Sequence, residues 1–211
     1  MSYIAIAGMV GAGKSSLAKL LANHYDSEAF YESVDDNPIL PLFYTATEEE
    51  IQEKRYPFLL QLHFLNTRFK AIKDAQYDDL NVMDRSIKED KLFARVNYEL
   101  GRISDLELDI YNHLFDNLNE EIEDPHTVVY LSGSFETILN RIKRRGREYE
   151  LDEGLVAYYK ELWTRYDEWV FNNFNNSEIV VINIDSFDYV NNEDDKEMVL
   201  KLIDSCVKIK I

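Results

Sequence analysis

The stretch from Gly8 to Ser16 reads GMVGAGKSS; it follows an apolar run directly and leads into KSSLAKLLANHY. Gly8, Gly13, Lys14 and Ser15 give the spacing G-x-x-x-x-G-K-S between a predicted strand and a predicted helix, which is typical of a phosphate-binding loop. The backbone amides of such a loop converge on phosphate oxygens, and the helix N-terminus adds a favourable dipole. A glycine-rich turn without a ligand is disfavoured, because strand, loop and helix are all in place. The stretch therefore predicts a bound nucleoside triphosphate.

The residues of this loop have different expected tasks. Lys14 should reach the β and γ phosphates, and Ser15 should supply an oxygen to magnesium. The donor-binding residues expected from the loop are Gly8, Gly11, Gly13, Lys14, Ser15 and Ser16.

Five short apolar runs alternate with longer helical patterns along the chain. They are YIAIAGM at 3–9, EAFYES at 28–33, LNVMDRS at 80–86, TVVYLSG at 127–133 and EIVVINID at 178–185. Nearly continuous apolar character suits strands covered on both faces, and alternation with helices predicts a parallel sheet. We therefore expect an α/β fold with a five-stranded parallel sheet flanked by helices, in one domain over residues 1–211.

Two helices should begin at capping boxes, Thr47 with Glu50 and Ser104 with Glu107. The first, EEEIQEKRYPFLLQLHFLNTRFKAIKDAQ, is expected to be one long helix kinked at Pro57, because proline removes a backbone donor and clashes with the preceding turn.

Charge and composition exclude several classes of function. Lysine and arginine number 23 against 40 acidic residues, a formal charge of -17, so binding to nucleic acid or to anionic membranes is not expected. The lone Cys206 has no partner for an internal disulfide, and the apolar stretch at residues 3–10 is too short to span a membrane and lacks signal-peptide flanks. We expect a cytoplasmic protein.

Glu32 stands at the end of the second predicted strand, where ligands of open parallel sheets bind. No lysine or arginine occurs between residues 20 and 53. A phosphorylated acceptor would need cations there, whereas an alcohol needs a carboxylate to take its proton. Glu32 therefore favours an alcohol acceptor, although a solvated surface acid is the alternative.

The third predicted strand ends in the segment Asp84, Arg85 and Ser86. A carboxylate at this position can hold magnesium directly or through water, and the arginine can neutralise charge on the transferring group. The alternative is an acid and arginine that only close a helix start. We expect Asp84 to be a metal ligand and Arg85 to be catalytic.

Four arginines, at positions 141, 144, 145 and 147, crowd one segment of this acidic chain. Such a run is often only a solvated face. Beside a phosphate-binding loop, however, a mobile arginine segment can stabilise charge on the γ-phosphate and exclude water. We therefore predict an arginine-rich lid at about residues 141–152.

These motifs indicate a small-molecule kinase. The D-x-x-G and N-K-x-D signatures of a GTP switch do not occur in the sequence. Two alternatives stay open: a nucleoside monophosphate kinase similar to thymidylate kinase, and a non-catalytic regulator that binds nucleotide.

With the phosphate loop, the strand-end glutamate, the DRS segment and the R-G-R-x-x-E segment in this order, the chain resembles the deoxynucleoside kinases, most closely the bacterial deoxyadenosine and deoxyguanosine kinases. The resemblance covers essentially the full length. It implies that Glu32 is the base for the sugar's 5′-hydroxyl, assisted by Arg85. It also implies that Tyr44 and Glu150 contact the 3′-hydroxyl and that Gln61 reads the base. Family members are commonly homodimers through a helical interface, so a homodimer is expected.

A glutamine suits a base edge, because its amide offers a donor and an acceptor side by side. Helical spacing should place Phe58, Gln61 and Leu65 on one face, with apolar walls beside the amide. The alternative is a polar residue on a packed helix. Phe64 and Phe93 are more often core residues than stacking platforms, so we assign them no role in the site.

The resemblance also implies that Arg145 and Arg147 contact the phosphates of ATP. Ser33 stands where relatives have proline, which should leave catalysis intact. Asp90 and Lys91 stand where several relatives have an aspartate and an arginine, and lysine lacks the planar fork of arginine. We expect Asp90 to bind substrate, and the surrounding segment DRSIKEDKLF resembles purine kinases. The predicted reaction is magnesium- and ATP-dependent phosphorylation of a purine deoxynucleoside.

Overall fold

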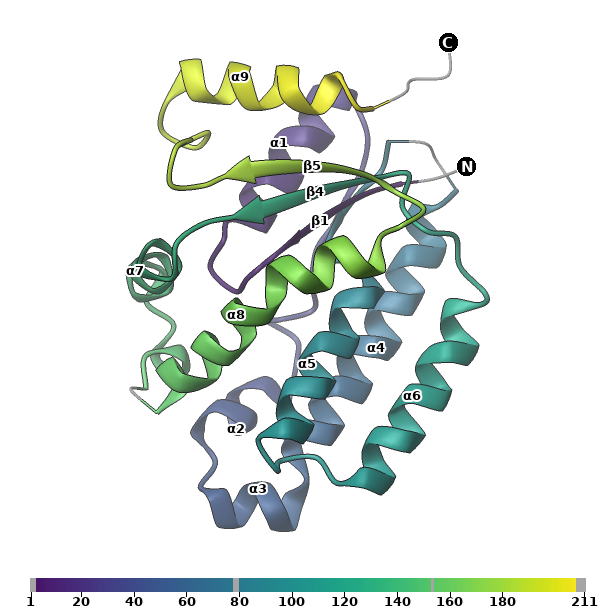
Figure 1. Ribbon diagram of the computed structural model, residues 1–211, viewed down its shortest axis with the longest axis vertical. Helices are drawn as coiled ribbons and strands as arrows, with labels where there is room; N and C mark the ends of the chain where they lie inside the picture. Colours follow the sequence, from purple (N-terminus) through teal and green to yellow (C-terminus); the bar gives the residue numbers. More distant parts are fainter. Residues whose placement is uncertain (1–2, 78–79, 153, 208–211) are drawn as a thin grey trace.

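The computed structural model describes residues 3–77, 80–152 and 154–207. Five parallel strands form the sheet in the order β2-β3-β1-β4-β5 (Figure 1). Their bounds are Ile4–Gly8 for β1, Ala29–Phe30 for β2, Val82–Asp84 for β3, Thr127–Ser132 for β4 and Glu178–Asn183 for β5. The predicted five-stranded parallel sheet is confirmed.

Helices cover both faces of the sheet. Their bounds are Lys14–Tyr25 for α1, Leu40–Thr45 for α2, Glu48–Lys54 for α3, Tyr56–Ala75 for α4, Ile87–Glu99 for α5, Asp105–Asn119 for α6, Phe135–Arg145 for α7, Leu155–Asn173 for α8 and Glu193–Asp204 for α9, with a short 3-10 helix η1 at Glu148–Glu150. Figure 1 shows α1 and α9 over one face of the sheet and α4, α5 and α8 over the other, with α6 outside α4 and α5. Among the described helices, none is long and apolar enough to cross a membrane.

Both predicted capping boxes are present, at Thr47 before α3 and at Ser104 before α6. The prediction of one long helix kinked at Pro57 was wrong. The chain turns at Arg55, whose φ of 56° ends α3, and a new helix begins at Tyr56. Pro57 lies in the first turn of α4, where the backbone N–H that proline lacks has no partner within a helix.

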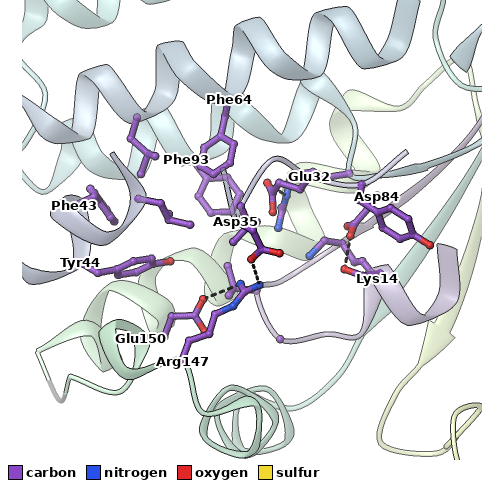
Figure 2. A pocket seen from close by; sticks show the side chains of 18 of the residues that line it. Lys14, Glu32, Asp35, Phe43, Tyr44, Phe64, Asp84, Phe93, Arg147 and Glu150 are labelled. Atoms are coloured by element: carbon purple, nitrogen blue, oxygen red, sulfur yellow. Dashed lines mark hydrogen bonds and ion pairs between the residues drawn. The ribbon is translucent and has the colours of Figure 1, made fainter. Parts of the chain in front are cut away.

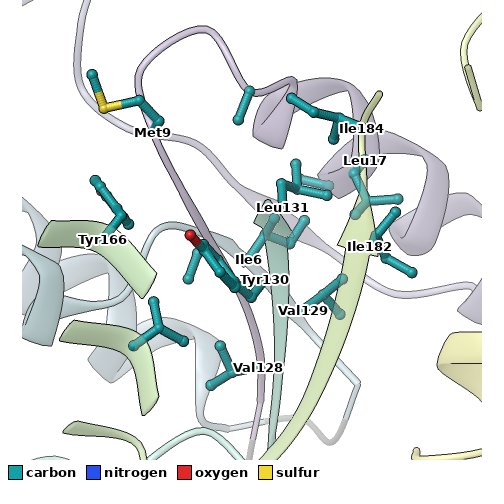
Figure 3. Packing of buried hydrophobic residues seen from close by; sticks show 14 of the residues in the cluster. Ile6, Met9, Leu17, Val128, Val129, Tyr130, Leu131, Tyr166, Ile182 and Ile184 are labelled. Carbon is teal, nitrogen blue, oxygen red and sulfur yellow. The ribbon is translucent and has the colours of Figure 1, made fainter. Parts of the chain in front are cut away.

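The strand before the phosphate loop is anchored on both sides of the sheet. All five residues of β1 are buried, and Ile4 and Ile6 pack into one apolar cluster while Ala5 packs into the other. In Figure 3 the side chain of Leu17, from α1, gathers with strand residues such as Ile182. Burial of a leucine or isoleucine side chain stabilises a fold by roughly 1.5–3 kcal/mol. Strand β1 and helix α1 therefore hold the loop between them in a fixed place.

Candidate active site

Two cavities meet at the phosphate loop. The inner cavity, of about 320 Å³, lies at the carboxyl ends of β1 and β3 and is lined by residues of α2, α4 and α5 as well. Figure 2 shows Lys14 and Asp84 at one end of it, Glu32 between, and Tyr44 and Glu150 at the other end. The outer cleft, of about 750 Å³, lies on the far side of the loop against α7 and the segment after β5. Residues that line both are Gly11, Lys14, Ser15, Arg145 and Arg147.

The loop has the backbone form that its glycines allow. Gly11 and Gly13 have φ of 81° and 102°, in the left-handed region that other residues rarely adopt. The Nζ of Lys14 is buried and donates to the carbonyl of Met9 at 3.1 Å. Burial, followed by the nearby charge of Arg85, lowers the pKa of Lys14 to about 8. A phosphate bound beside this amine would favour its charged form.

Ser15 and Asp84 lie together, as a magnesium site would require. The hydroxyl of Ser15 donates to Oδ2 of Asp84 at 2.5 Å. The other oxygen of Asp84, Oδ1, is buried without a hydrogen-bond partner. Within the described residues there is no cluster of three or more histidine, cysteine, aspartate or glutamate side chains that could hold a metal. One carboxylate and one hydroxyl fit Mg²⁺, which in such sites takes its other ligands from phosphates and water.

Glu32 is held between two arginines. Its Oε1 accepts from Nη2 of Arg68 at 2.7 Å and from Nε of Arg85 at 3.2 Å. Burial alone would raise its pKa, but Arg85, Arg68 and Lys14 together lower the pKa of Glu32 to about 2. The carboxylate is therefore ionised and lines the inner cavity, and its role as acceptor of a hydroxyl proton stays a prediction. Arg68 was not predicted.

Arg85 is fixed from behind by the buried carboxylate of Glu89. Oε1 of Glu89 accepts from Nη1 of Arg85 at 3.0 Å, from the backbone N–H of Gly8 at 3.1 Å and from the hydroxyl of Tyr166 at 2.9 Å. The guanidinium of Arg85 also lies over the ring of Phe93, 4.7 Å from its centroid. Since Arg85 has a φ of 84° and is only 1% exposed, these contacts hold a strained backbone in place. Glu89 and Tyr166 were not predicted.

Gln61 and Asp90 both line the inner cavity, and their contact with the base stays a prediction. Arg68 donates through Nε to Oδ2 of Asp90 at 2.8 Å, and both side chains are buried. The predicted neighbours of Gln61 were wrong. Phe58 and Leu65 do not line the cavity; they pack into the separate cluster that contains Ala5 and Met83 and residues of α5 and α6.

The apolar walls of the cavity come instead from Leu60, Phe64 and Phe93. The latter two were assigned no role from the sequence. Lys91 does not line the cavity; it forms an ion pair with Asp116 of α6 at 2.8 Å.

Tyr44 and Glu150 close the far end of the inner cavity. The ring of Tyr44 stacks on Tyr149 at 5.6 Å between centroids. Burial, followed by the neighbouring Tyr159 and Tyr158, raises the pKa of Tyr44 well above its usual value, so its hydroxyl stays protonated. Glu150 accepts hydrogen bonds from the predicted lid arginines at positions 145 and 147.

The four arginines of the predicted lid divide into three groups. Arg141 donates to the carbonyls of Ala12 and Ile184 at 2.8 and 3.1 Å and so supports the phosphate loop. Arg144 lines only the outer cleft. Arg145 and Arg147 line both cavities, and their contact with the phosphates of ATP stays a prediction.

A phosphate-binding loop on a parallel sheet, with a carboxylate beside its lysine, defines a P-loop kinase. The chain belongs to the deoxynucleoside kinase family, whose sequence profile matches residues 4–208. It is accordingly a deoxynucleoside kinase.

Several named proteins are similar to this chain. The deoxyguanosine kinase of Lactobacillus acidophilus is 43% identical over 96% of this chain and 90% of its own length. The deoxyadenosine kinase of the same species is 41% identical, over 97% and 95%. The solved structure of deoxyadenosine kinase from M. mycoides with bound dATP has a TM-score of 0.79 and 28% identity, over 96% of this chain and 99% of that chain.

Proposed function

We propose that this protein transfers the γ-phosphoryl group of ATP to the 5′-hydroxyl of a purine deoxynucleoside, giving the 5′-monophosphate for nucleotide salvage. The observation that carries the proposal is the ionised carboxylate of Glu32, which lines the same cavity as Lys14 and Arg85. An alcohol acceptor needs such a carboxylate, whereas a monophosphate needs free cations. The positive charges of Arg68 and Arg85 are balanced by the carboxylates of Glu32, Asp90 and Glu89, so this group of side chains has no net positive charge for the phosphate of a monophosphate acceptor.

In the proposed reaction the 5′-oxygen forms a bond to the γ-phosphorus, and the bond from that phosphorus to the β–γ bridging oxygen breaks, which releases ADP. The hydroxyl proton moves to Glu32. A carboxylate of low pKa is a weak base, but the transition state of phosphoryl transfer is loose, so orientation of the hydroxyl counts for more than basicity. Arg85 would stabilise charge on the transferring group. A magnesium ion at Ser15 and Asp84 would neutralise charge on the phosphates.

The acceptor would lie along the inner cavity with its sugar at Glu32 and Tyr44. We assign Tyr44 and Glu150 to the 3′-hydroxyl, since the first can donate and the second can accept. Gln61 and Asp90 are assigned to the base edge. The aromatic walls beside them would cover the faces of the base.

The preference for purine rests on the relatives, which are named deoxyguanosine and deoxyadenosine kinases, and on the position of Asp90 in the cavity. The test is transfer of labelled phosphate from ATP to each of the four deoxynucleosides and to each of their 5′-monophosphates. Deoxyadenosine or deoxyguanosine should be phosphorylated fastest. Transfer to the monophosphates alone would establish the thymidylate-kinase-like alternative, and tight ATP binding without transfer would favour a regulator.

We further propose that the enzyme is a cytoplasmic homodimer. Leu106, Ile110 and Leu114 form an apolar stripe along the outer side of α6, and their exposed fractions are 69%, 47% and 38%. Residues spaced by four lie on one face of a helix, so the stripe is continuous. A second copy of the same helix would bury it by symmetry.

A further inference from the structure

Glu150 and two arginines form a compact ion cluster on the wall between the two cavities. Nε and Nη2 of Arg145 donate to Oε2 of Glu150 at 3.0 and 2.5 Å, and Nη1 of Arg147 donates to Oε1 at 3.4 Å. The side chain of Glu150 is 2% exposed, whereas those of Arg145 and Arg147 are 35% and 30% exposed. The carboxylate lines only the inner cavity, and both arginines also line the outer cleft.

The same guanidinium edges suit a carboxylate and a phosphate. Arg145 presents two N–H groups of one edge to Glu150, the arrangement in which arginine also binds phosphate oxygens. The other terminal nitrogen of Arg147 lies 3.7 Å from Asp35, also on the side of the inner cavity (Figure 2). Both arginines therefore face acids rather than the phosphate loop. A triphosphate that recruits them competes with Glu150.

Loss of those arginines would be costly for Glu150. A buried carboxylate without a partner is strongly unfavourable, and a hydroxyl donated by an acceptor would relieve part of that penalty. The triphosphate and the acceptor would then each increase the affinity of the protein for the other, although they need not both contact Glu150.

We propose that Glu150 couples the donor site to the acceptor site by exchanging partners: it holds Arg145 and Arg147 until ATP recruits them, and then accepts the hydroxyl of the deoxynucleoside. This inference rests on the proposed function, which supplies the two ligands. Glu150 would thus lower the affinity for ATP when no acceptor is bound, and raise the affinity for the acceptor when ATP is bound.

The test is a set of binding measurements by calorimetry. The probes are the Mg²⁺ complex of an ATP analogue with an imido group between the β and γ phosphates, and deoxyadenosine or deoxyguanosine, each titrated alone and in the presence of the other. The normal chain should bind the deoxynucleoside about 5- to 150-fold more tightly when the analogue is present. Glu150→Gln should bind the analogue alone more tightly than the normal chain does. The gain in affinity should roughly equal the factor by which the mutual enhancement of binding falls in this variant.

The deoxynucleoside should bind Glu150→Gln more weakly, and the mutual enhancement should fall to about twofold or less. Glu148→Gln is the matched control, because Glu148 is exposed in the same short helix; it should behave as the normal chain does. Arg145→Met gives a second route: with the main partner of Glu150 removed, deoxynucleoside binding should become nearly independent of the analogue.

The inference would be overturned if Glu150→Gln bound the analogue more weakly than the normal chain, or if the two ligands still enhanced each other's binding in this variant. Either result would mean that the arginines stay paired with Glu150 while they bind phosphate. Phosphate transfer by the normal chain separates this failure from failure of the proposed function. If the normal chain phosphorylates deoxynucleosides and Glu150→Gln keeps the coupling, only the exchange of partners is wrong. If the normal chain binds no deoxynucleoside, the proposed function itself fails.

Discussion

Nη2 of Arg68 donates to Oε1 of Glu32 at 2.7 Å, so the carboxylate proposed to receive the hydroxyl proton is held by a helix far from it in the sequence. Through its Nε the same guanidinium also holds Asp90. Arg68 thus links the part of the cavity assigned to the base with the part assigned to the reacting oxygen.

Arg68→Met should destabilise the protein strongly, because it leaves the buried Asp90 without its hydrogen-bond partner. The expected loss in the free energy of unfolding is about 3–5 kcal/mol, measured by urea denaturation. Arg95→Met is the control: Arg95 is an exposed arginine of α5 that forms an ion pair with Glu99 one turn further along the helix, and its loss should cost less than about 1 kcal/mol.

Adding Asp90→Asn to Arg68→Met should recover part of the lost stability, since the unpaired charge is gone. A double variant no more stable than Arg68→Met alone would contradict this account of the pair.

ATP binding should weaken as the pH rises above about 8. The pKa of Lys14 is lowered to about 8 in the free protein, so above that pH the amine is neutral and must take up a proton when it meets the phosphates. The dissociation constant of ATP should then increase by up to tenfold per pH unit. Calorimetry in two buffers of different ionisation enthalpy would detect the proton taken up. An ATP affinity that is constant from pH 7.5 to about 9.5 would show that Lys14 stays charged.

Gly13→Ala should damage the phosphate loop. The φ of 102° is strained for alanine, and a Cβ would lie 2.7 Å from the hydroxyl oxygen of Tyr189. Strain of this kind costs on the order of 1–3 kcal/mol, and we expect ATP affinity to fall at least about tenfold. Gly101→Ala is the control, because Gly101 has a φ of 72° but no atom within 4 Å of the added Cβ. It should lower the melting temperature slightly and leave ATP binding unchanged; equal ATP affinity in both variants would refute the prediction.

Ile110→Glu should convert the proposed dimer to monomer, because it places a charge in the middle of the apolar stripe on α6. Size-exclusion chromatography with light scattering measures the mass directly. Asn112→Glu, on the other side of the same helix, adds the same charge away from the stripe and should leave the dimer intact. A normal chain that is already monomeric at about micromolar concentration would contradict the proposed dimer.

The sequence predicted those parts of the site that depend on local spacing. Gly13, Lys14 and Ser15 form one continuous motif. Glu32 follows β2 and Asp84 is the last residue of β3, so the parallel sheet brings them to one edge. These placements need no knowledge of how the helices pack.

The parts that were missed depend on packing between distant elements. Arg68 reaches Glu32 only because the side of α4 that carries Arg68 faces the sheet. Tyr166 contacts Glu89, which lies 77 residues away in the sequence. The orientation of α4 could not be predicted correctly, because the left-handed conformation of Arg55 starts a new helix where one continuous helix was expected. The one local signal for Glu89 was its place three residues after Ser86, which makes the capping box of α5.

The central claim is that the ionised carboxylate of Glu32 orients the 5′-hydroxyl and receives its proton. Turnover of Glu32→Gln, measured with saturating ATP and deoxynucleoside, tests it most directly, with the exposed Glu28→Gln as control. We predict that Glu32→Gln loses about two to four powers of ten in turnover while it still binds the deoxynucleoside. Turnover within about twofold of the normal enzyme would contradict the claim.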